Sequence, residues 1–250
     1  MDRLILICND DGIDAVGIKV LEAALRSLGH VVTVAPDKER SASSHSLTLR
    51  KPIEVITVDE DHYRVCGTPT DCVLLATQII LDRAPDVVVS GINHGPNMGE
   101  DVTYSGTVAA AFEGTILGAA SIAISALQRS VANADVNGRY ARIIVEEVLT
   151  RGLPKGTLLN VNIPDPDISE IKGIRITKLG SRAYENFIDE EKSPDKKALY
   201  TIGGNEPIWK DDEGTDIAAI REGTVSITPL QLDLTNYKAI VDMERWRLEP

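Results

Sequence analysis

The chain is poor in cysteine and has no long hydrophobic run. Its three cysteines, Cys8, Cys66 and Cys72, form no CxxC pair, and an odd number of cysteines indicates a reducing compartment rather than a disulfide-stabilised scaffold. Met1-Asp2-Arg3 leads directly into the apolar residues 4–7, a run far too short for a signal sequence or a membrane span. We therefore expect a cytoplasmic protein with no membrane partner.

Positive charge is also scarce. Lys and Arg number 26 against 38 Asp and Glu, which gives a net charge of −12 over 250 residues. A field of this sign repels nucleic acid and anionic lipid, and no basic segment stands out, so we expect no nucleic-acid duplex as a partner. A phosphate-bearing ligand would need a local positive element, such as a metal ion or a helix N-terminus.

Three common motifs are missing. Neither a Walker A lysine motif nor GxGxxG follows the first apolar segment, which argues against nucleoside triphosphate hydrolysis and dinucleotide binding. The Gly-x-Ser-x-Gly elbow of serine hydrolases is absent as well. The composition, 43% hydrophobic and 26% charged, is that of an ordinary globular protein, and the length fits one large domain or two small ones.

What is present is a regular alternation of strand and helix patterns. Residues 4–8 form a continuous apolar run, and a helical pattern that includes Ile18, Leu21 and Leu25 follows and ends at Gly29 before the next apolar run at 31–35. This order predicts a β-α-β unit with parallel strands that are buried on both faces. We expect an α/β protein with a Rossmann-like, doubly wound, mostly parallel sheet.

The remaining elements extend this pattern. Strands are predicted at residues 86–90, 121–125, 158–163 and 225–229, helices at 70–81, 107–117 and 140–149, and a peripheral β-hairpin at 51–58 and 63–66. Between Ser181 and Asp216 the chain is charged and reads as a long loop, which is uncommon inside a compact domain. We expect a core over residues 1–180 and a C-terminal extension over 181–250 that returns to the core.

The ligand site of an open parallel sheet lies beyond the carboxyl ends of its strands. The first strand ends in Asn9-Asp10-Asp11-Gly12, where a turn at Gly12 lets both carboxylates point to one place. Two converging carboxylates call for a cation between them. The Ser41 hydroxyl and the Asn93 amide oxygen complete an all-oxygen set that favours Mg²⁺, Mn²⁺ or Ca²⁺ over Zn²⁺. The alternative is a turn with helix-capping carboxylates.

A second candidate site is the start of the helix near residue 107. The hydroxyls of Ser105 and Thr107, with the free backbone N–H groups of the first turn, predict a phosphate site without a basic residue. Ordinary N-capping is the alternative. His45 and His94, in nearby loops, are either proton donors, ligands or solvated side chains. Cys8 is expected to be a core residue.

Five blocks of the chain, taken in their order, match the motifs of a known family. They are residues 7–12 (ICNDDG), 35–42 (APDKERSA), 67–72 (GTPTDC), 90–99 (SGINHGPNMG) and 104–108 (YSGTV). Together they resemble the SurE survival-protein family of metal-dependent 5'-nucleotidases. The resemblance weakens past Gly180 and returns at residues 221–223 and 225–230. Cys8 stands where the family more often has Thr, and Thr224 where an aromatic residue is frequent, but neither is a proposed ligand.

The resemblance implies one bound divalent ion, for which Mg²⁺ and Mn²⁺ are preferred over Ca²⁺. It also implies hydrolysis of nucleoside 5'-monophosphates, with 3'-nucleotides and short polyphosphate as further substrates. It implies a homodimer or homotetramer in which a C-terminal arm is exchanged. The residues at the family's metal-ligand positions are Asp10, Asp11, Ser41 and Asn93, and those at its phosphate positions are Asn97, Ser105, Gly106 and Thr107.

These assignments lead to a mechanism and to rival functions. We expect the ion to polarise a phosphoryl oxygen and to activate a water, while Asn97 and the helix start stabilise the other oxygens. Asp10 or Asp11 would accept the proton of the water; direct attack by Asp10 on phosphorus is the alternative, although the DxDxT arrangement is absent. A nucleotide-binding regulatory module without turnover is the rival, and a sugar-transfer domain shares only the fold class.

Overall fold

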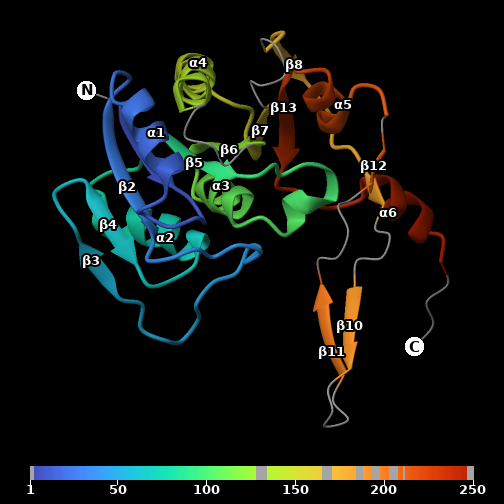
Figure 1. Ribbon diagram of the computed structural model, residues 1–250, viewed down its shortest axis with the longest axis horizontal. Coiled ribbons are helices and arrows are strands. Elements are labelled where there is room, and N and C mark those ends of the chain that lie inside the picture. The colour runs from blue at the N-terminus through green and yellow to red at the C-terminus, as the bar shows by residue number, and fades with distance from the viewer. Residues whose placement is uncertain are drawn as a thin grey trace.

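The computed structural model describes residues 3–127, 134–164, 171–183, 188–192, 198–202, 208–210 and 212–246. Within these residues one sheet of nine strands has the order β3-β4-β2-β1-β5-β6-β7-β13-β8 (Figure 1). Its strands are β1 (Leu4–Cys8), β2 (His30–Pro36), β3 (Val55–Thr57), β4 (His62–Val65), β5 (Val87–His94), β6 (Ala120–Ala126), β7 (Thr157–Ile163), β8 (Ile174–Ile176) and β13 (Val225–Gln231). Neighbours run parallel except in the pairs β3–β4 and β7–β13.

Helices cover both faces of this sheet. On one face lie α1 (Val16–Leu25) and α4 (Ala134–Arg151), and on the other lie α2 (Pro69–Leu75) and α3 (Gly106–Ile116). Because successive strand residues point to opposite faces, Ile5 and Ile7 pack with α1, whereas Leu4, Leu6 and Cys8 pack with α2. The expected doubly wound α/β fold is confirmed. In the described part of the chain, every helix is too short or too polar to cross a bilayer.

Some predicted boundaries differ from the structure. The helix predicted at 140–149 begins earlier, at Ala134, and the one predicted at 70–81 consists of α2 followed directly by a π-helical turn, η1 (Ala76–Ile80). The strand predicted at 86–90 continues to His94, and a 3-10 helix, η2 (Gly99–Thr103), lies in the expected loop. Gly91 has a φ of +143°, and the register with β6 shifts just after it, so this glycine marks an irregularity within the strand instead of its end.

The predicted hairpin forms at the sheet edge. β3 is antiparallel to β4, as expected, but β4 also pairs in parallel with β2, with Thr33 opposite His62. The hairpin is therefore part of the main sheet.

The segment 181–216, expected to be a loop, contains short strands. β9 (Arg182–Ala183) pairs with β12 (Ile208–Trp209), and β10 (Ile188–Lys192) pairs with β11 (Ala198–Ile202), both antiparallel. A charged segment such as β10 can form a strand because the hydrogen bonds of the ladder come from the backbone. Figure 1 shows the β10–β11 hairpin projecting away from the sheet. The chain returns through α5 (Asp216–Arg221) and β13 and ends its described part after α6 (Tyr237–Met243).

Candidate functional site

The strand order reverses direction at β1. The chain leaves β1 through α1 to reach β2 on one side, and β5 later takes the place on the other side. Loops that leave neighbouring strands in opposite directions open a ligand site at the carboxyl ends of those strands. The loop after β1 contains Asp10 and Asp11, and the end of β5 contains Asn93 and His94.

The turn after β1 is fixed from two sides. Gly12 has a φ of +97°, a conformation that favours glycine, and a Cβ there would lie 3.2 Å from the carbonyl carbon of Lys38. The Asn9 side chain donates to the Gly12 carbonyl oxygen at 2.9 Å. The backbone N–H of Arg40 donates to the Asp10 carbonyl oxygen at 2.7 Å. The loop after β2 therefore lies directly against the carboxylate pair.

Asp10 meets the N-terminus of α3. Its side chain is buried, and the Thr107 hydroxyl donates to its Oδ1 at 2.5 Å. At Gly106 a Cβ would lie only 2.9 Å from Asp10 Oδ2 and 2.7 Å from Ser43 Oγ. Glycine is thus required for the helix to approach the carboxylate so closely. Two segments predicted separately, one for the metal and one for the phosphate, are in direct contact.

Asp11 lies beside the end of β5. The His94 backbone N–H donates to its Oδ2 at 3.2 Å, and His94 Nδ1 lies 3.9 Å from its Oδ1. Asn93, the residue before His94, donates from Nδ2 to the Gly95 carbonyl oxygen at 2.8 Å. The structure therefore brings Asp10, Asp11 and the backbone next to Asn93 to one edge of the sheet.

The carboxylates repel each other. Burial raises the pKa of Asp10 to about 6; the hydrogen bond from Thr107 opposes this, and the negative charge of Asp11 adds to it. A cation between the two side chains would offset both burial and repulsion.

In the first turn of α3, one backbone N–H is capped by a side chain, and others are left for a ligand. The Ser105 hydroxyl accepts from the Val108 N–H at 3.1 Å, so the N-capping alternative describes Ser105 correctly. The N–H groups of Gly106 and Thr107 have no acceptor inside the helix, since the first turn has none to offer. A helix start of this kind, next to a carboxylate pair, is suited to hold a phosphate group with a cation.

Ser41 and Ser43 lie in the loop after β2. Ser41 is exposed, and its hydroxyl donates to Glu39 Oε1 at 2.6 Å in this structure. Ser43 was not predicted from the sequence; its Oγ is buried against Gly106, and within the described residues it has no hydrogen-bond partner. A second serine two residues after a candidate ligand was the available signal.

Asn97 is held by a buried polar cluster. Its Nδ2 donates to Ser125 Oγ at 2.8 Å, and its backbone N–H donates to Asn162 Oδ1 at 2.9 Å. Its carbonyl oxygen accepts from Asn160 Nδ2 at 2.8 Å and from Asn162 Nδ2 at 2.9 Å. Sequence reasoning missed these two asparagines, although two amides at alternate positions of an apolar strand were a signal of one polar, buried face.

The two histidines differ in their surroundings. His94 lies beside Asp11, whereas His45 Nε2 lies 2.9 Å from Glu113 Oε2 and its ring stacks on Phe112. His45 lines a groove of about 900 Å³ that runs along α3 and β13 and includes Ser105. Cys8 is buried in the core, as expected, and all three cysteines are free.

The donors present fit a hard divalent cation. Within the described residues no group of three or more His, Cys, Asp and Glu is placed to hold an ion, so an ion here would combine Asp10 and Asp11 with hydroxyl or amide oxygens. Such an all-oxygen set suits Mg²⁺, Mn²⁺ or Ca²⁺. Within the described residues, the Ser43 Oγ beside Gly106 is a buried polar atom with no hydrogen-bond partner, so it is available to a bound group.

Comparisons with known proteins point to one family. Residues 5–186 match the family model "Survival protein SurE". A protein of Geobacter sulfurreducens named 5'-nucleotidase SurE is 48% identical over 98% of this chain and 94% of its own length. One of the same name from Aquifex aeolicus is 49% identical over 94% of both chains.

A solved structure is similar along nearly the whole chain. The crystal structure of the SurE protein from Aquifex aeolicus superposes with a TM-score of 0.86 and 46% identity, covering 96% of this chain and 98% of that one. The resemblance predicted from the five sequence blocks is thereby confirmed. This chain belongs to the SurE family.

Proposed function

We propose that this protein is a divalent-metal-dependent phosphomonoesterase that hydrolyses nucleoside 5'-monophosphates, with 3'-nucleotides and short polyphosphate as further substrates. The observation on which this depends is the contact between Asp10 and the N-terminus of α3. It combines a cation-binding carboxylate and a phosphate-binding helix start in one place. The names of the relatives support the substrate class.

Each residue then has a stated task. Asp10 and Asp11, with Ser41 and Asn93, would hold Mg²⁺ or Mn²⁺, which supplies a Lewis acid for the phosphoryl group when bound. The N–H groups of Gly106 and Thr107 bind phosphoryl oxygens, and Ser105 fixes the helix start that presents them. Asn97 donates to another phosphoryl oxygen. A carboxylate oxygen of Asp10 or Asp11 accepts the proton of the attacking water.

The test is phosphate release from a panel of nucleotides with Mg²⁺ or Mn²⁺ and after addition of EDTA. We expect turnover that EDTA abolishes, and Asp10→Asn to reduce kcat/KM by about 10³-fold or more, since it removes a ligand charge and one of the two carboxylates that can accept the proton. The melting temperature of the variant should stay close to that of the wild type. Turnover that is indifferent to EDTA, or tight retention of an intact nucleotide, would refute the proposal.

We propose that the enzyme works in the cytoplasm. Three free cysteines, one of them half-exposed at Cys66, are compatible with a reducing compartment.

We propose further that two or four copies assemble through the C-terminal extension, each lending an arm to another. On the β10–β11 hairpin Ile188, Leu199 and Ile202 are exposed. α6 has no buried residue and exposes Tyr237 and Val241. Apolar surface of this extent on projecting elements favours burial against a partner. The groove beside α3, with Phe112 and Leu230 in its walls, supports a second copy as the occupant.

A further inference from the structure

The loop that contains Asn97 has no regular secondary structure and is held in place by a small number of hydrogen bonds. Before Asn97, the Gly95 N–H donates to the Ala126 carbonyl oxygen at 2.9 Å. After it, the Gly99 N–H donates to Asp216 Oδ2 at 2.9 Å. Between these points the backbone N–H and carbonyl of Asn97 are bound by the side chains of Asn160 and Asn162 on β7. The orientation of Asn97 therefore depends on these two side chains.

We infer that Asn162, with Asn160 beside it, is a positioning residue that aims the Asn97 side chain at a phosphoryl oxygen. The inference rests on the proposed function of Asn97 and extends it to a pair of residues on another strand, 63 and 65 positions further along the chain. Asn162 is the main element of the pair because it contacts Asn97 twice, as acceptor at Oδ1 and as donor at Nδ2.

The burial of the pair argues for such a role. Asn160 and Asn162 are fully buried in a strand whose neighbours Leu158, Val161 and Ile163 belong to the apolar core. Within the described residues, Asn160 Oδ1 has no hydrogen-bond partner. A buried amide with an unused acceptor destabilises a fold relative to an apolar side chain of similar size. The amides therefore serve the loop they bind, not the core around them.

Within the described residues, one of the two N–H groups of the Asn97 side chain has no acceptor. Nδ2 carries two hydrogens, and Ser125 Oγ accepts one of them. The second remains for a ligand oxygen. Since both backbone groups of Asn97 are bound to β7, rotation of either adjoining peptide would break a contact to Asn162. A misplacement of about 1 Å in a positioning group can reduce a rate by about 100-fold.

The experiment is a double-mutant cycle on the full-length protein with Mg²⁺. Asn162→Ala and Asn97→Ala are made singly and together, and two quantities are measured: kcat/KM for a nucleoside monophosphate and the Kd of inorganic phosphate by calorimetry. Asn162→Ala should lower kcat/KM by about 10- to 100-fold and weaken phosphate binding. In the Asn97→Ala background the same substitution should change either quantity by less than about 2-fold, because the side chain it aims is gone.

Matched controls separate positioning from general destabilisation. Asn137→Ala removes another buried asparagine, on α4, and should leave both quantities unchanged even where it lowers the melting temperature. If Asn162→Ala does not fold, Asn162→Asp, which keeps the acceptor for the Asn97 N–H and loses the donor, replaces it in the cycle and should give the same pattern.

Additive losses in the cycle, wild-type behaviour of the Asn162 variants, or no binding of phosphate by the wild type would each overturn the inference. Phosphate binding keeps it separable from the proposed function. A wild-type protein that binds phosphate but hydrolyses no nucleotide would refute the proposed nucleotidase function. The phosphate Kd values of the cycle would still test the positioning role of Asn162.

Discussion

At the scale of single residues, the candidate site depends on a glycine, Gly106. Gly106 is the first residue of α3, and its lack of a Cβ allows the helix start to touch Asp10 and Ser43. Helix propensity alone favours alanine at a helical position by about 1 kcal/mol. The close approach of the carboxylate outweighs this preference, since real Cβ atoms do not come within 3.0 Å of such neighbours. The glycine is retained for the contact.

Gly106→Ala should therefore impair the site more than the fold. We expect kcat/KM to fall by about 100-fold, because the added methyl group displaces Asp10 or the helix start by several tenths of an ångström or more. Steady-state kinetics and calorimetric metal titration measure the effect. Gly138→Ala, in the middle of α4, is the control and should leave kinetics unchanged. Wild-type kinetics for Gly106→Ala would contradict the role assigned to this contact.

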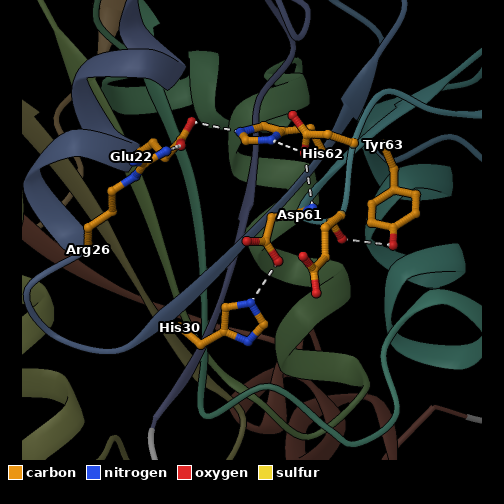
Figure 2. A network of polar contacts seen from close by, with 8 residues as sticks. Glu22, Arg26, His30, Asp61, His62 and Tyr63 are labelled. Atoms are coloured by element: carbon orange, nitrogen blue, oxygen red, sulfur yellow. Dashed lines mark hydrogen bonds and ion pairs between the residues drawn. The ribbon is translucent and has the colours of Figure 1, made fainter.

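At the scale of elements, a charged network links the edge hairpin to α1 (Figure 2). His62 on β4 contacts Asp59 through Nδ1 at 2.6 Å and Glu22 on α1 through Nε2 at 3.1 Å, and Arg26 pairs with Glu22. Both ring nitrogens face a carboxylate, so both must donate, and only the imidazolium can do that. Burial alone would lower the pKa of His62, but the hydrogen bonds to Asp59 and Glu22 raise it above its usual value of 6.5.

This network predicts a pH-dependent stability. A histidine whose pKa is raised on folding stabilises fully below pH 6.5, and its contribution is lost as the pH rises through the raised value. At acid pH the network persists, because Arg26 and His62 lower the pKa of Glu22 against the effect of burial, and the hydrogen bond from His62 lowers the pKa of Asp59.

His62→Gln should thus reduce the melting temperature by about 2–4 °C at about pH 6 and have little effect at about pH 9. Thermal unfolding of both proteins across this range measures the difference. His30→Gln is the control, because His30 contacts a single carboxylate, Asp61, through one nitrogen. A His62→Gln deficit that is constant with pH would show that packing, not charge, is the source.

Another buried carboxylate, that of Asp216, links the loop after Asn97 to the residues around Gly180. Asp216, at the start of α5, accepts from the N–H of Gly99 at 2.9 Å and from the N–H of Gly180 at 2.7 Å. Burial raises the pKa of Asp216 despite these hydrogen bonds. Two residues after Gly180, Arg182 pairs with Asp101 in η2. The segment that follows Asn97 and the residues around Gly180 are therefore held together.

Asp216→Asn should destabilise this junction. An amide directs at least one N–H toward a backbone N–H that it cannot bind, at a cost of about 1–3 kcal/mol, so we expect the melting temperature to fall by several degrees. The exposed Asp212→Asn is the control and should be neutral. Thermal denaturation of both variants and the wild type measures the effect. Equal melting temperatures for Asp216→Asn and the wild type would show that Asp216 does not stabilise the junction.

At the scale of the whole molecule, one group of exposed apolar side chains lies on the described part of residues 181–250. Besides the β10–β11 hairpin, α6 and the residues near it expose Leu234, Ile240 and Trp246. A monomer of net charge −12 gains solubility from its charge but not from surfaces like these. The proposed exchange of arms would bury them.

Tyr200→Ser combined with Ile202→Ser, on one side of β11, should lower the molecular mass measured by light scattering at a given concentration, because the pair removes apolar contact area from the proposed interface. Ile79→Ser, an equally exposed apolar residue on η1, should not change the mass. A wild-type chain that is monomeric at micromolar concentration would contradict the proposed assembly.

The sequence by itself determined the fold class and the candidate residues of the site. The apolar runs of β1 and β2 and the helical pattern between them are local signals of burial, and they predict strands and helices because period and burial are properties of short segments. The oxygen-rich end of β1 marked Asp10 and Asp11 as candidates, and the hydroxyl-bearing start of α3 marked Thr107, for the same reason.

Only the tertiary structure decided which of these residues touch. The contact of Asp10 with Thr107 spans 97 positions, and that of Asn97 with Asn162 spans 65; both follow from strand order and register, which no local pattern specifies. The same reason explains the strands β10 and β11, which lie in a charged stretch of the sequence that predicts a loop, because only backbone pairing over the tertiary structure places them side by side. Long-range pairing converts residues of suitable chemistry into a site.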